Sequence, residues 1–195
     1  MKSVRFAMLL LALALAACGR GEVRPGTSDI TGAMPDLSFS MVRANDGVAV
    51  SADDYRGKVV LLYFGYTHCP DACPTTLANL ATVLQTLGSQ AKQVRVLFVT
   101  VDPARDTLPI LKAYVASFAP EIDGLRGTDD EVASLARRYR VLYRVTQTPS
   151  GGVEVMHASS TFFFDREGHA RLVTTSTDDT AAIAGDIARL LRSDS

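Results

Sequence analysis

The 195-residue sequence is poor in the residues on which many functions depend. It contains no tryptophan, three cysteines and three histidines. Its 20 basic and 21 acidic residues are interleaved, which excludes the basic stripe that a nucleic-acid-binding surface needs. The length and a hydrophobic content of 47% suffice for one packed domain. With so few thiols and imidazoles, any soft metal site or redox couple must be built from a handful of positions.

A long apolar run of the kind that spans a membrane is also absent. The N-terminal run, residues 6–17, is shorter than the ~20 residues a spanning helix needs and follows two basic residues, as in a secretory signal. It ends in "LAAC", residues 15–18, which resembles the bacterial lipobox, whose cysteine is lipidated. We therefore expect a lipoprotein signal peptide over 1–17 and lipidation at Cys18. The protein would then lie in the bacterial cell envelope, lipid-anchored to a membrane and facing the periplasm or the outside.

The rest of the chain predicts a tether followed by one α/β domain. Residues 18–33 are rich in glycine, serine, threonine and charge, and predict a lipidated, flexible N-terminal tether before a domain over 34–195. Two short β-like runs flank Asn45-Asp46-Gly47, which indicates a β-hairpin. Apolar periodicity beyond it predicts strands and helices in the order β-α-β-α-α-β-β-α. These elements are centred on strands 59–66 and 94–101, helices 77–88, 107–118 and from 128, strands 161–165 and 170–175, and a helix over 183–190.

This order resembles the thioredoxin fold, a central mixed sheet flanked by helices, over roughly residues 37–192, with the β-hairpin added at its N-terminal side. In that fold the redox cysteines follow the first core strand, at the start of the first core helix. Cys69 and Cys73 of "FGYTHCPDACPTT" occupy that position. Thioredoxin relatives also place a cis-proline before the strand that follows the middle helices. Here no proline precedes Phe162, and His157 lies four residues before Thr161 instead.

Taken alone, the two cysteines could form a structural disulfide, a redox couple or a pair of metal ligands. Pro74 disfavours helical geometry at Cys73 and suits a first helical residue, so Cys73 is expected near the helix cap. The helix dipole there favours a thiolate, whereas the charge of Asp71 opposes one. Two thiolates joined by the imidazole of His157 would make a soft site that suits Cu(I).

Four stretches carry a closer resemblance: "YFGYTHCPDACPTT", "VTVDPARDT", "GLRGT" and "HASSTFFFDREG". Their order and spacing are similar to those of the Sco/SenC family of copper-binding proteins. The resemblance implies a membrane-tethered copper chaperone with a thioredoxin-like copper-binding domain. It would hold copper as Cu(I), with Cu(II) as a second state, and deliver it to the dinuclear copper centre of cytochrome c oxidase. The implied copper ligands are Cys69, Cys73 and His157.

The implied partners are the oxidase subunit that carries the dinuclear copper site, other copper carriers or thiol reductants, and the membrane. The carboxylates of Asp71 and Asp102 are expected near the ligands. Whether the chain is an enzyme stays open. The alternative function is an extracytoplasmic thiol-disulfide oxidoreductase that acts on partner cysteines through a redox disulfide between Cys69 and Cys73. A copper site needs His157, whereas dithiol chemistry does not.

Overall fold

The fold is organised around β4 (Val59–Gly65), a strand buried along its whole length because its apolar run is covered on both faces. β5 (Val94–Thr100) pairs with it in parallel, and β6 (Ile122–Arg126) pairs in parallel with β5. On the other side of β4 lie β9 (Thr161–Phe164) and then β10 (Ala170–Thr174), both in antiparallel pairings. The computed structural model describes residues 26–147, 153–157 and 159–192, with the backbone alone over 153–157.

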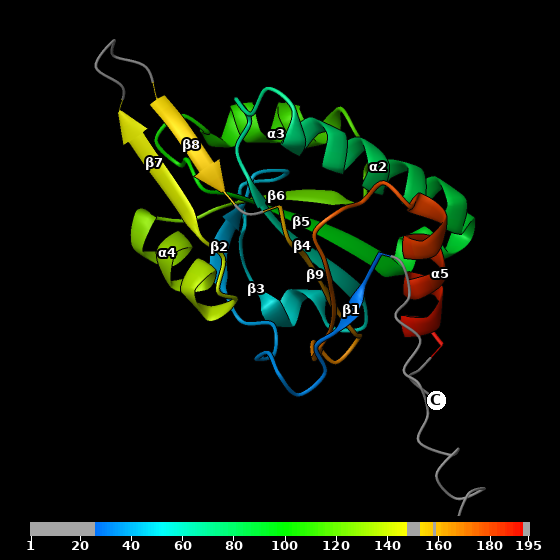
Figure 1. Cartoon of the computed structure of the whole chain (residues 1–195). Coiled ribbons are helices and arrows are strands. Elements are labelled where there is room, and N and C mark those ends of the chain that lie inside the picture. Colours follow the sequence, from blue (N-terminus) through cyan, green and yellow to red (C-terminus); the bar gives the residue numbers. More distant parts are fainter. Residues whose placement is uncertain (1–25, 148–152, 158, 193–195) are drawn as a thin grey trace, which may run out of the picture.

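Helices cover both faces of this mixed sheet (Figure 1). They are α2 (Ala72–Leu87), α3 (Leu108–Ala116), α4 (Asp129–Arg138) and α5 (Thr180–Leu190), with short 3-10 helices η1 (Ala52–Tyr55) and η2 (Gly88–Gln93). α2 and α3 share one face because both connect parallel strands by right-handed crossovers in the same direction, and α5 packs against α2. On the other face, Tyr139 at the end of α4 packs on Phe162 and Phe164, with ring centroids 5.5 Å apart in each pair.

The α/β, thioredoxin-like fold class is confirmed, and so is the predicted N-terminal hairpin. β2 (Ser40–Arg43) and β3 (Ala49–Ser51) pair in antiparallel fashion, and β2 also joins the edge of β6. Gly47 in the connecting turn has a φ of 77°, a backbone conformation that glycine adopts without strain. The capping box predicted at the start of α4 is also present: Thr128 Oγ1 accepts a hydrogen bond from the backbone N–H of Glu131.

Two parts of the described fold are missing from the sequence-based order. β6 escapes it because Asp123 and Gly124 interrupt the apolar pattern of a short strand. Gly124 lets α3 approach the sheet, since a Cβ there would lie 2.7 Å from Leu111 Cγ. β7 (Tyr143–Gln147) and β8 (Val153–His157) form a separate two-stranded sheet, drawn at the upper left of Figure 1.

The ordered domain begins before the predicted boundary at Met34. A short strand, β1 (Ser28–Asp29), pairs with β10 at the sheet edge, and the Thr27 hydroxyl donates a 2.5 Å hydrogen bond to Asp186 in α5. The C-terminal part of the predicted tether, from residue 27 onward, is therefore packed on the domain. The predicted signal peptide and lipidation site lie outside the described residues. Within the described ranges, no helix has the length and apolarity required to cross a membrane.

Candidate metal centre

The two cysteines lie at the carboxyl end of the central strand, between the end of β4 and the first turn of α2. α2 begins at Ala72, two residues earlier than the expected start at Pro74, so Cys73 lies within the first turn. The helix accommodates Pro74 there because first-turn N–H groups have no intrahelical partner to lose.

Cys73 is completely buried, at 0% exposure, and it depends on a glycine for its space. Gly65 is the last residue of β4, and a Cβ built on it would lie 2.9 Å from Cys73 Sγ and 2.5 Å from Phe98 Cε2. Any side chain at position 65 would therefore displace the thiol or the ring. Burial raises the pKa of Cys73 to about 12, so its thiol keeps its proton at neutral pH.

Cys69 lies in a different environment, half-buried and close to the same helix end. The backbone N–H of Cys73 donates to Cys69 Sγ over 3.4 Å. Partial burial raises the pKa of Cys69, but hydrogen bonds from the backbone N–H groups of Asp71 and Cys73 outweigh it and hold the pKa below the ordinary value. Neither cysteine is part of a disulfide in this structure. The pair is therefore asymmetric, with one accessible thiol that ionises readily and one buried thiol that stays protonated.

Three tyrosines interact with the thiols. Burial raises the pKa values of Tyr63, Tyr66 and Tyr114, and the neighbouring cysteine thiols raise them further. The Tyr63 hydroxyl interacts with both Thr76 and Cys73. These phenols stay neutral at physiological pH, so they can donate hydrogen bonds to sulfur.

Neither carboxylate expected near the ligands has a described hydrogen bond to a cysteine side chain. Asp71, the N-cap residue of α2, approaches Cys69 through its backbone N–H, while its carboxylate accepts from the Thr75 hydroxyl at 3.5 Å. Asp102 is buried and paired with the Arg105 guanidinium, whose central carbon lies 5.9 Å from the centroid of the Tyr66 ring. The Asp102 carboxylate is therefore connected to the tyrosine beside Cys69 through Arg105.

The backbone of His157 lies in the part of the chain that leads to this end of the sheet. It is the last residue of β8 and pairs with Tyr143 of β7. Tyr143 lines a hollow of about 270 Å³ together with Asp102 and Pro103, which follow β5. Four residues beyond His157, Thr161 opens β9 and pairs with Tyr63 of the central strand. The side chain of His157 is outside the described residues, so its role as a ligand stays a prediction.

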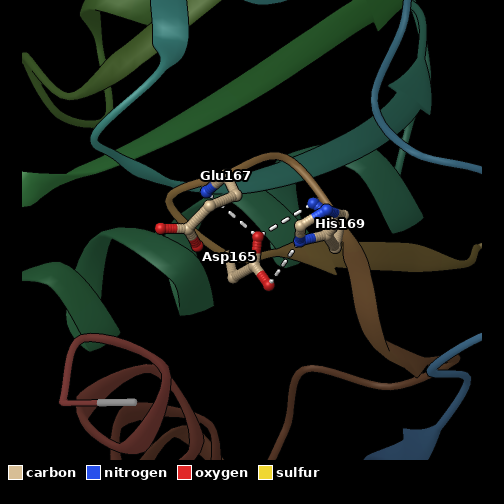
Figure 2. A group of neighbouring side chains, drawn as sticks. All are labelled: Asp165, Glu167 and His169. Atoms are coloured by element: carbon tan, nitrogen blue, oxygen red, sulfur yellow. Dashed lines mark hydrogen bonds and ion pairs between the residues drawn. The ribbon is translucent and has the colours of Figure 1, made fainter. Parts of the chain in front are cut away.

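A second group of ligand-type side chains lies in the turn between β9 and β10, at the opposite end of the sheet (Figure 2). Donor atoms of Asp165, Glu167 and His169 lie within 4.8 Å of one another. Asp165 Oδ1 accepts hydrogen bonds from the N–H groups of Glu167 and His169, at 3.1 and 2.8 Å. Its Oδ2 lies 3.4 Å from both His169 Nδ1 and an Arg171 nitrogen. This carboxylate is occupied in shaping the turn and neutralising Arg171.

Sequence reasoning singled out neither Gly65 nor Asp106, the two positions that support the thiols without supplying a ligand atom. Asp106 is fully buried and accepts hydrogen bonds from both the backbone and the hydroxyl of Thr67, two residues before Cys69. The motif "VTVDPARDT" did indicate an acidic residue near the cysteine loop, because it places Asp102 and Asp106 just after the neighbouring strand β5. Which of its two aspartates turns toward the cysteine loop follows only from the folded loop.

Comparison with known proteins places this geometry in a family. The sequence pattern of the family described as SCO1/SenC matches residues 31–192. The chain belongs to the SCO1/SenC family. The mitochondrial protein SCO1 homolog of Mus musculus is 36% identical over 160 residues, or 80% of this chain and 55% of the mouse protein. The SCO2-like protein RP587 of Rickettsia prowazekii is 32% identical over 132 residues, or 67% of this chain and 64% of its own length.

Solved SCO1/SenC structures superimpose closely on the chain. Bradyrhizobium japonicum ScoI, determined with copper bound, gives a TM-score of 0.73 at 34% identity and covers 80% of this chain and 99% of its own. Apo Sco1 from Thermus thermophilus gives a TM-score of 0.75 at 30% identity and covers 89% and 100%. This chain spans between 36% and 64% of the full length of the curated relatives it matches, so the relatives contain further segments.

Proposed function

We propose that this SCO1/SenC chain is a copper chaperone that binds Cu(I) through Cys69, Cys73 and His157 and passes it to the dinuclear copper centre of cytochrome c oxidase. The observation that carries the proposal is the pair of neighbouring cysteine thiols at one end of the sheet, one partly exposed and one buried, neither of them in a disulfide. Such sulfur donors suit Cu(I). Relatives of about the same fold and 32–34% identity have been solved with copper bound.

The asymmetry of the thiols suggests an order of events. An incoming ion meets Cys69 first, because that thiol is the more exposed and ionises more readily. Cys73 then loses its proton as the ion binds, so loading releases protons. The imidazole of His157 completes a three-donor site. Transfer runs in the reverse direction, as a partner's ligand displaces the accessible thiolate first.

A competitive Cu(I) titration of the reduced protein tests the proposal. The wild-type chain should bind one equivalent tightly, and His157→Ala should weaken binding by more than the ~10- to 100-fold that loss of an outer hydrogen bond costs at a metal site. His169→Ala is the matched control, because it removes an exposed histidine at the opposite end of the sheet. Equal affinity of wild type and His157→Ala would reject the three-ligand site.

The same geometry favours a second activity, thiol-disulfide exchange with partner cysteines. A thiol with a lowered pKa beside a buried partner is the arrangement in which the first attacks a disulfide and the second resolves the mixed disulfide. The attack breaks the partner's S–S bond, and the closing Cys69–Cys73 disulfide gives the partner its two electrons. The Cys69→Ser variant should lose this exchange, and His157→Ala should keep it, which separates the two functions.

The proposed function also includes attachment to a membrane of the bacterial envelope through lipid on Cys18. The motif at residues 15–18 supports it. Cells that express Cys18→Ser should lose acyl labelling and release the protein from the membrane fraction. Unchanged fractionation and labelling of this variant would show that Cys18 does not carry the anchor.

A further inference from the structure

Asp106 is the most completely buried charged group beside the candidate metal centre, and it contributes no ligand. Its carboxylate is 0% exposed. It accepts hydrogen bonds from the Thr67 N–H at 3.0 Å, the Thr67 hydroxyl at 2.6 Å and the Thr100 hydroxyl at 2.6 Å. Burial of a carboxylate costs several kcal/mol unless such donors compensate it. The imidazole of His68, which is half-exposed, places its Nδ1 3.6 Å from the carboxylate.

These bonds tie the first half of the cysteine loop to the neighbouring strand. Thr100 ends β5, and Thr67 lies in the loop that leaves β4. Cys69 follows Thr67 by two residues, and its own N–H donates to the Tyr66 carbonyl at 3.3 Å. Asp106 therefore fixes the backbone just before the accessible thiol from a position outside the loop.

The buried thiol has separate supports. Cys73 is held by the first turn of α2 and by its contact with Gly65. The distance between the two sulfurs thus depends on the start of α2, which holds Cys73 and whose Cys73 N–H donates to Cys69 Sγ, and on the bonds from Asp106 to Thr67, which hold the backbone before Cys69. A change in either should alter how the pair closes on an ion or on itself, because site geometry must be held within about 0.5 Å to function.

We propose that Asp106 is a positioning residue of this site: acting through Thr67, it holds Cys69 in place against Cys73 and thereby sets both the affinity for Cu(I) and the ease of closing the Cys69–Cys73 disulfide. The copper part rests on the function proposed above. The disulfide part does not, since it requires only the two thiols.

The test compares variants that differ in the bonds they remove. Asp106→Asn keeps the size of the side chain but replaces an acceptor oxygen with an NH₂ group, which faces donors at Thr67 or Thr100. Thr67→Val removes the hydroxyl and keeps the shape, and Thr67→Ser restores it. Asp123→Asn is the matched control, because Asp123 is also a buried carboxylate but bonds to the Tyr55 hydroxyl at 3.0 Å, away from the loop.

Two readouts are measured on the purified full chain in detergent: competitive Cu(I) affinity, and the equilibrium of the thiols with a dithiothreitol buffer. In the second, both thiols lose their protons and pass two electrons to oxidised dithiothreitol as the S–S bond forms. We expect Asp106→Asn to weaken Cu(I) binding about 10- to 100-fold and to shift the disulfide equilibrium at least several-fold. Thr67→Val should follow in the same direction, while Thr67→Ser and Asp123→Asn stay near wild type.

The outcomes distinguish a role in positioning Cys69 from a role in the stability of the fold. Urea unfolding measures the stability of each variant. A folded Asp106→Asn protein with wild-type values in both readouts would overturn the proposal. So would an Asp106→Asn variant that changes both readouts only as much as Asp123→Asn does. If Asp106→Asn does not fold, Thr67→Val decides by the same criteria. If the wild type binds no Cu(I), the copper function fails, while a disulfide shift in Asp106→Asn still supports positioning.

Discussion

The two ends of the central sheet contain nearly the same polar elements and use them differently. At one end the buried Asp106 lies 3.6 Å from the exposed His68, and at the other the buried Asp165 lies 3.4 Å from the exposed His169. Both carboxylates accept backbone N–H bonds that shape a loop. Among the described residues, the first end adds two thiols, and the second adds an arginine 3.4 Å from the carboxylate. Carboxylate and imidazole pairs of this kind occur at both ends, whereas the sulfur donors that suit Cu(I) lie at one of them.

The largest effect should come from removal of the buried sulfur. Cys73→Ser replaces a soft donor with a hard one, so tight Cu(I) binding should be lost entirely. Glu167→Ala at the opposite end is the comparison, and it should leave the Cu(I) affinity of the chain unchanged. Competitive titration of both variants measures this contrast. Retention of tight binding in Cys73→Ser would mean that the ion is held elsewhere.

The next effect is the dependence of Cu(I) affinity on pH. Above about pH 7.5, where an ordinary histidine is neutral, each protonated thiol must release a proton as the ion binds. Below the lowered pKa of Cys69 both thiols are protonated, so the affinity for Cu(I) should rise about 100-fold per pH unit. Above that pKa only Cys73 still releases a proton, so the affinity should rise about tenfold per pH unit, up to about pH 12. Proton release during titration in weakly buffered solution measures the number directly. Loss of both released protons over the same pH range would contradict the assigned asymmetry, because it would mean that the two thiols have similar pKa values.

A smaller effect is expected from the glycine that makes room for Cys73. Gly65→Ala places a methyl group 2.9 Å from the sulfur and 2.5 Å from Phe98, and such overpacking costs about 1–3 kcal/mol of unfolding free energy. Cu(I) affinity should fall as well, because the sulfur must move. Gly185→Ala in α5 is the control, since its new Cβ meets nothing within 4 Å and should stabilise the helix by up to about 1 kcal/mol. Urea unfolding and Cu(I) competition are measured on both variants. Equal stability and equal Cu(I) affinity of the two would contradict the requirement for glycine at position 65.

The smallest effect on copper should come from the opposite end. Asp165→Asn leaves two backbone N–H groups with a weaker acceptor and should cost about 1–3 kcal/mol of unfolding free energy. Its Cu(I) affinity should equal that of wild type. If Asp165→Asn weakened Cu(I) binding as much as Asp106→Asn, the two ends of the sheet would not be functionally distinct.

The sequence predicts most of this fold because the core strands are long apolar runs and the helices carry clear caps. The buried strand at 59–65, the capping box at Thr128 and the hairpin at Gly47 are examples. β6 was missed because its Asp123-Gly124 pair matches no strand pattern, although Gly124 is required there by the close approach of Leu111. Local composition cannot reveal a requirement that a distant helix imposes.

The same limit applies to the candidate site. Cys69 and Cys73 could be identified from their spacing, because thiols are rare in the chain and their chemistry is distinctive. The sequence predicts Asp102 near the ligands because it follows the second core strand, yet the loop turns Asp102 toward Arg105 and Asp106 toward Thr67. Two aspartates four residues apart cannot be distinguished without the backbone path between them.

The edge strand β1 determines where the N-terminal part of the chain joins the sheet. Ser28 pairs with Val173, next to the end of β10 that adjoins Thr161 and Tyr63, so the chain enters at the thiol end of the sheet. Only β10 and β9 separate this entry from β4, a sideways offset of about 14 Å at about 4.8 Å per strand. If lipid holds Cys18, the domain is attached to the membrane from the end of the sheet that carries the two thiols. The attachment would then lie at the same end of the sheet as the thiols, and the Asp165 turn at the opposite end.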